Sequence, residues 1–346
     1  MNSKLLSIFL LSLLFTSKCL AKGDHDLVIL ESESDSVETR GLGWQLQSGL
    51  PHDPTAFSFD GASNTPYFES RPHISLLLSP AIAMTWNKPE YSLEGVFFYR
   101  GEFDFFFHTR TSGPVISRLQ NPGILIGQHW KIQDPILRGV GLGLSVAHES
   151  NGMFIDNRAQ YNAMKATFPA DYAMQDFASM GWNSITEEAT VEFSFLGFLL
   201  RPRISLKQFM NQTDYNFTTL EDTGLFFWEG PRTHIWNYDG LKLDFTCIVP
   251  NDFWPLRFLH FPGFPWTHAE FRLGIQGGGL QSFSQKQMVA HPSYYLHLRG
   301  RWWHFPWMGF VRLEKSYADP IAYYPLSTYK GSVGIEFSNF SFGIRE

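Results

Sequence analysis

Apolar and polar side chains alternate along many stretches of this chain, which is the pattern of β-strands with one apolar and one polar face. The alternation is clearest in residues 139–150, 184–195, 241–249, 268–275 and 294–302. Weaker alternation occurs near residues 43–49, 73–86, 95–108, 123–132, 203–210, 308–315 and 331–344. Together these make roughly ten to twelve segments of about ten residues, the length of a membrane-spanning β-strand. The pattern therefore predicts an all-β fold of ten to twelve strands.

Alternation alone leaves two all-β architectures open. A soluble sandwich buries its apolar faces, whereas a transmembrane β-barrel turns them towards lipid and its polar faces inward. Aromatic residues make up 16% of the chain, and clusters such as 302–307 resemble the aromatic girdles of membrane barrels. After residue 21 no apolar run reaches the ~18 residues that a spanning helix needs. We therefore predict a transmembrane antiparallel β-barrel, with the sandwich as the alternative.

The N-terminus has the pattern of a secretory signal peptide over residues 1–21. Lys4 gives the positive start, residues 5–15 form an apolar run, and Cys19-Leu20-Ala21 offers a small-residue cleavage site. The alternative is an uncleaved anchor, but the run is short for a spanning helix. Residues 22–41 are acidic and serine-rich and are predicted to form an arm, and residues 42–346 the barrel.

Charge and cysteine content narrow the possible functions further. The formal net charge is −6, and nothing in the sequence resembles the clustered basic residues of a nucleic-acid-binding protein. We therefore predict no nucleic-acid partner. After the signal peptide the chain keeps a single cysteine, Cys247, so a disulfide within the exported chain is excluded.

The strand predicted over residues 139–150 ends in two side chains that can do chemistry. His148 and Ser150 share the apolar face of Val140, Leu142, Leu144 and Val146. Two residues along a strand span about 6.6 Å, so an imidazole could act as base for the hydroxyl. Asn183 opens the next alternating segment and, if the two strands are hairpin neighbours, would project beside His148 and orient its ring. A nucleophile and a base on an apolar outer surface suggest chemistry on lipid.

Three motifs in residues 95–195 resemble the outer membrane phospholipase A family of Gram-negative bacteria. They are His148-Glu149-Ser150-Asn151-Gly152, then Trp182-Asn183, and upstream Ser112-Gly113-Pro114 with Pro122. The resemblance implies a twelve-stranded outer membrane barrel that hydrolyses phospholipid acyl esters at its outer wall, as a phospholipase of A1/A2 type. It also implies Ser150 as nucleophile, His148 as general base, Asn183 as orienter and the Gly152 N–H as oxyanion donor.

The same resemblance implies Ca²⁺ as cofactor and a homodimer as the active form. By this resemblance, the calcium ion would be bound by the main-chain oxygen of Met153, by Ser179, and by Ser112 of the partner subunit. Because the loop over residues 152–181 is longer than expected, Asp156 or Asp176 could replace or supplement Ser179.

Two further points bear on these expectations. Where the family has a glutamine in the dimer interface, this chain has Arg100, which is costly in an apolar interface unless it is paired, for example with the partner's Glu102. The alternative functions are a non-catalytic pore or lipid-binding barrel, with His148 and Ser150 as incidental rim residues, and a lipopolysaccharide deacylase.

Overall fold

The computed structural model describes strands almost throughout, over residues 26–31, 41–47, 54–63, 73–105, 115–150, 163, 181–210, 240–249, 266–277, 293–302, 307–316, 328–337 and 340–345. The strands are β1 (Asp26–Glu31), β2 (Gly41–Gln47), β3 (Thr55–Ser63), β4 (His73–Leu78), β5 (Ala81–Asn87), β6 (Tyr91–Phe105), β7 (Val115–Lys131), β8 (Leu137–Ser150), β9 (Gly181–Phe195), β10 (Phe198–Met210), β11 (Leu241–Val249), β12 (Trp266–Gly277), β13 (Ser293–Trp302), β14 (Trp307–Ser316), β15 (Thr328–Phe337) and β16 (Phe340–Arg345). Within these ranges no helix is long and apolar enough to cross a bilayer.

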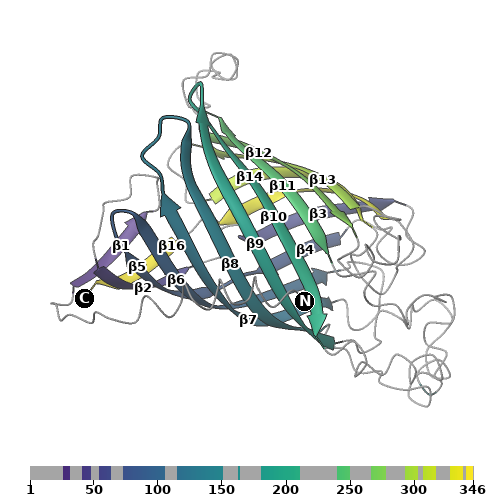
Figure 1. Cartoon of the computed structure of the whole chain (residues 1–346). Coiled ribbons are helices and arrows are strands. Elements are labelled where there is room, and N and C mark those ends of the chain that lie inside the picture. Colours follow the sequence, from purple (N-terminus) through teal and green to yellow (C-terminus); the bar gives the residue numbers. More distant parts are fainter. Residues whose placement is uncertain are drawn as a thin grey trace, which may run out of the picture.

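All the strands belong to one antiparallel sheet that closes on itself. The sheet runs from β7 through β8 to β15, continues through β3 and β4 to β6, and closes where β6 pairs with β7 (Figure 1). The predicted barrel is therefore confirmed, and a sandwich is excluded because its sheets would keep free edges.

Some wall positions are shared by two short strands. β4 and β5 pair with successive halves of β6 in one continuous register, from Ile74 opposite Phe105 to Asn87 opposite Ser92. β2 shares a wall position with β3, and β16 shares one with β15, but with a shifted register between the two halves. Strands β2 to β16 therefore occupy 12 wall positions. β1 pairs with β16 only and lies within residues 22–41, the segment predicted as an arm.

The alternation of the sequence appears as an inner and an outer wall. Along β8 the outward side chains Leu142 and Val146 are 39% and 46% exposed, whereas Ala147 and Glu149 on the opposite face are buried. Apolar side chains face outward on the other strands too, including Phe97, Ile124, Ile204, Leu243, Leu273, Leu313 and Val333. This is the arrangement of a barrel whose outer surface contacts hydrocarbon.

The turn between β9 and β10 explains why these two strands form a tight hairpin. Its two residues, Leu196 and Gly197, have φ values of 50° and 82°. Positive φ at both positions is the type I′ geometry, whose twist matches that of the flanking strands. Glycine adopts this conformation without cost, whereas a leucine there is unusual.

Charged side chains fill the lumen and pair with one another. Arg203 of β10 donates to Asp244 of β11 at 3.0 Å through Nε and at 2.6 Å through an Nη, and Tyr295 of β13 also donates to Asp244. Arg299 of β13 contacts Glu270 at 2.7 Å and Glu336 at 3.2 Å. These carboxylates are only about 5% exposed, so this part of the lumen is packed with ion pairs.

Replacing Asp244 should destabilise the barrel strongly. Asp244→Ala leaves the guanidinium of Arg203 in the packed lumen without this carboxylate, and breaking such a buried pair costs about 3–5 kcal/mol. Glu90→Ala, in the exposed turn between β5 and β6, is the matched control and should change little. Urea unfolding of the refolded barrel measures both, and equal stability of the two variants would contradict a stabilising role for the pair.

Candidate active site

His148 and Asn183 lie opposite each other at one end of the barrel. β8 and β9 are hydrogen-bonded neighbours, with His148 opposite Asn183 and Ser150 opposite Gly181 in the register. The strand pairing on which the predicted orienter depends is therefore present. Both side chains are exposed on the outer wall, where their strand phase predicted them.

A hydrogen bond joins the two side chains. Nδ1 of His148 lies 2.9 Å from Oδ1 of Asn183. Because an amide oxygen only accepts, Nδ1 carries the proton and donates it, which leaves Nε2 of the neutral ring as the basic nitrogen. This is the tautomer that a general base for a serine hydroxyl requires.

Ser150 is the last residue of β8. It lies two residues after His148 and shares the outer face with it. Among the contacts of the described residues, no hydrogen bond joins the Ser150 hydroxyl to the His148 ring. In structures without substrate, such catalytic hydrogen bonds are often long and tighten only when substrate binds. The role of Ser150 as nucleophile therefore stays a prediction.

Glu149 lies between these two residues but faces the opposite way. Its carboxylate is buried in the lumen and forms an ion pair with Lys207 of β10. The wall of the barrel separates it from His148, so Glu149 is no alternative orienter.

The structure adds two residues that sequence reasoning missed. Gln120 of β7 lies directly opposite Ser150 in the register, and the Tyr99 hydroxyl of β6 donates to its Oε1. Gln120 thus brings a second amide to the outer face beside Ser150. Its position two residues before Pro122, within a motif already singled out, was the available signal.

Four of the predicted site residues fall in parts of the chain outside the described residues. They are Gly152, the predicted oxyanion donor, and the predicted calcium ligands Ser112, Met153 and Ser179. Their roles stay predictions. The donor set itself, one main-chain oxygen and two hydroxyls, suits a hard cation such as Ca²⁺.

The expectation that Arg100 lies in an apolar dimer interface is wrong. Arg100 shares its strand phase with Val96 and Asp104, which are 2% and 3% exposed, whereas Phe97 on the other phase is 59% exposed. Arg100 therefore faces the lumen. Glu102 has the same phase and lies 3.9 Å from Lys330, so it is not available to a partner's arginine.

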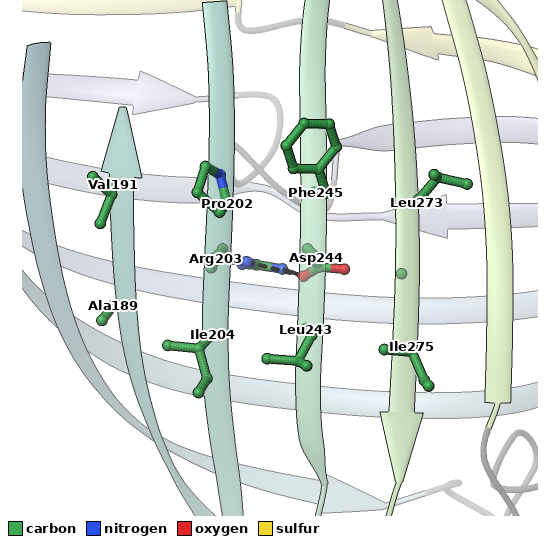
Figure 2. Close-up of a pocket in the computed structure, with 11 residues that line it drawn as sticks. Ala189, Val191, Pro202, Arg203, Ile204, Leu243, Asp244, Phe245, Leu273 and Ile275 are labelled. Atoms are coloured by element: carbon green, nitrogen blue, oxygen red, sulfur yellow. Dashed lines mark hydrogen bonds and ion pairs between the residues drawn. The ribbon is translucent and has the colours of Figure 1, made fainter. Parts of the chain in front are cut away.

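A shallow hollow marks the outer wall further along β9 to β12, with a volume of about 520 Å³. Figure 2 shows apolar side chains such as Ile204, Leu243 and Phe245 lining it, while Arg203 and Asp244 point behind the strands and pair in the lumen. Ala189, on its rim, lies six residues from Asn183, roughly 20 Å along the strand. The hollow is therefore part of the apolar outer wall and is separate from the polar side chains of His148, Ser150 and Asn183.

The fold resembles that of known outer membrane barrels. An active-site mutant of outer membrane phospholipase A from Escherichia coli superposes with a TM-score of 0.47 at 12% identity, covering 89% of this chain and 95% of that one. A calcium-bound dimer of the Salmonella typhi outer membrane phospholipase gives 0.46 at 12% identity, with 83% and 91% covered. An outer membrane channel from Pseudomonas putida F1 gives 0.41 at 9% identity, with 91% and 99% covered. No protein-family model and no curated protein matches the chain.

Proposed function

We propose that this chain is a calcium-dependent phospholipase of A type in the outer membrane, acting through Ser150, His148 and Asn183. The observation that carries the proposal is the 2.9 Å hydrogen bond from His148 Nδ1 to Asn183 Oδ1 on the outer wall, with Ser150 on the same face of β8. An oriented imidazole beside a serine is the arrangement of an acyl-transfer site. Its place on an apolar outer wall favours a lipid ester as the substrate.

The depth of the site supports a membrane lipid as substrate. The turns between β5 and β6, β7 and β8, and β9 and β10 are short, whereas the chain between Ser150 and Gly181 at the opposite end is long. In membrane barrels of this kind the short turns are periplasmic and the long loops extracellular. The site would then lie near the outer-leaflet headgroups, with the apolar face of β8 and β9 alongside the acyl chains.

The reaction proceeds in two steps. The Ser150 hydroxyl attacks the ester carbonyl carbon while His148 Nε2 takes its proton, and His148 then returns this proton to the departing lysolipid alkoxide. Water hydrolyses the resulting acyl-serine by the same proton transfers, releasing the fatty acid. Asn183 holds the ring in position throughout and, unlike an aspartate, adds no charge to a lipid-facing wall.

The oxyanion of each tetrahedral intermediate needs donors. In the proposal the Gly152 N–H provides one, and Ca²⁺ held by Ser112, Met153 and Ser179 supplies positive charge when bound. Metal removal should therefore suppress hydrolysis while leaving the barrel folded.

Activity should depend on calcium and on dimerisation together. If Ser112 completes the site of a neighbouring barrel, metal and partner are linked, so each should strengthen the binding of the other. Fatty-acid release and crosslinking, followed across a dilution series in detergent with Ca²⁺ or with chelator, should then rise and fall together. Full activity in a demonstrated monomer would contradict the dimer and leave the Ser150 chemistry intact.

Parallel assays separate the alternative functions. Phospholipid and lipopolysaccharide substrates, compared side by side, decide between a phospholipase and a lipopolysaccharide deacylase. Bilayer conductance tests the pore, which the packed ion pairs of Arg203 and Arg299 in the lumen disfavour. Open-channel conductance without labelling of Ser150 by a sulfonyl fluoride would overturn the proposal.

A further inference from the structure

Three side chains that can bind a metal meet on the lumen side of the wall, away from the site on the outer wall. Asp60 of β3, His73 of β4 and Asp104 of β6 form this lumen cluster, and their ligand atoms all lie within 4.8 Å of one another. Strand pairing brings them together, since Asp60 lies opposite His73, and Asp104 lies opposite Ser75, two residues along β4 from His73.

The distances within the lumen cluster leave room for a cation. His73 Nε2 lies 3.8 Å from Asp60 Oδ2 and 3.7 Å from Asp104 Oδ1. Both distances are too long for hydrogen bonds. Ligands of a tetrahedral metal with bonds of ~2.0–2.2 Å lie about 3.3–3.6 Å apart. Small side-chain movements would therefore place all three atoms around one ion.

The surroundings hold the two carboxylates in position. Ser58 Oγ donates to Asp60 Oδ1 at 2.7 Å, and Ser75 Oγ donates to Asp104 Oδ1. Asp60, His73 and Asp104 are only 1%, 2% and 3% exposed. Hydrogen bonds of this kind orient metal ligands, and carboxylates so deeply buried need a cation close by.

Lys330 of β15 provides such a cation and would compete with a metal. Its Nζ lies 2.9 Å from Asp60 Oδ2, the oxygen that faces His73, and 3.9 Å from Glu102 Oε1. An ion bound to Asp60 would repel the ammonium towards Glu102. Metal binding and the Lys330–Asp60 contact therefore exclude each other. Removing the Lys330 ammonium should for this reason raise the affinity for a metal.

We propose that the lumen cluster binds one Zn²⁺ ion through His73 Nε2 and one oxygen each of Asp60 and Asp104. A nitrogen with two carboxylates suits a borderline cation such as Zn²⁺, whereas Ca²⁺ takes all-oxygen sites. The inference is independent of the proposed phospholipase activity. The ion would join β3, β4 and β6 at the end of the wall where β4 begins.

The test is a Zn²⁺ titration of the metal-free, refolded full chain in detergent. We expect one Zn²⁺ per barrel, retained in excess Ca²⁺. His73→Ala should lower the affinity at least about 100-fold. His297→Ala is the matched control, because His297 is also buried in the lumen and pairs with a single carboxylate, Glu336, at 3.0 Å. If His73→Ala fails to fold, Asp104→Asn, which keeps the side-chain size, replaces it.

A second variant should bind Zn²⁺ more tightly than the parent, whereas the first should bind it more weakly. Lys330→Met removes the competing ammonium and should raise the Zn²⁺ affinity severalfold. Absence of stoichiometric Zn²⁺, an equal loss in the His73 and His297 variants, or a lower affinity in Lys330→Met would overturn the proposal. The lumen cluster would then be an ion-pair network centred on Lys330.

Discussion

Ser150→Ala is expected to abolish fatty-acid release from phospholipid micelles containing Ca²⁺. Without the hydroxyl no acyl-serine forms, and loss of a nucleophile from a catalytic triad costs at least about 10³-fold in rate. Ser150 ends β8 with the outward strand phase, so its side chain points away from the ion pairs of the lumen. The variant should therefore fold like the parent, as judged by circular dichroism and by the gel mobility of the unheated protein.

Ser145→Ala is the matched control for this variant. Ser145 lies on the same strand, five residues earlier and on the lumen phase with Ala147 and Glu149. It should keep full activity, and a sulfonyl fluoride should label both the parent and this control but not Ser150→Ala. An unchanged rate in Ser150→Ala would remove Ser150 as the nucleophile.

Asn183→Ala should lower kcat by about 10²–10⁴-fold, because a ring without its Nδ1 acceptor loses the required tautomer and position. KM should change little, since the amide of Asn183 contacts His148 in the mechanism and not the lipid. Asn183→Asp should be tolerated better than alanine, because a carboxylate accepts the same hydrogen bond. Rate measurements as a function of pH should show a shifted profile in the aspartate variant, since its charge stabilises the imidazolium.

Gln208→Ala controls for a merely structural effect. Gln208 lies on the neighbouring strand β10, opposite Ile185, and has the outward phase of Asn183. It should behave as the parent. Parent-like activity in both Asn183 variants would mean that Asn183 only begins a strand and that the orienter assignment fails.

Much of the wall could be predicted because alternation is a local property of a strand. Residues 241–247 alternate regularly, and β11 has the bounds predicted for the segment, 241–249. The segment predicted at 123–132 was too short, because Asn121-Pro122 breaks the pattern inside β7, which begins at Val115. The single segment predicted at 73–86 is divided into β4 and β5 at Ser79-Pro80, where proline lacks the N–H of a strand ladder.

The sequence by itself determined the fold class and which face of a strand each side chain takes, because successive residues of a strand must point to opposite sides. It therefore placed His148 and Ser150 on one apolar face, and Asn183 beside them only on the condition that the two strands are neighbours. Only the tertiary structure decided which residues meet across strands. It brought Gln120 beside Ser150 and assembled Asp60, His73 and Asp104 in the lumen, because these contacts depend on the register between strands and on closure of the barrel, which no local pattern encodes.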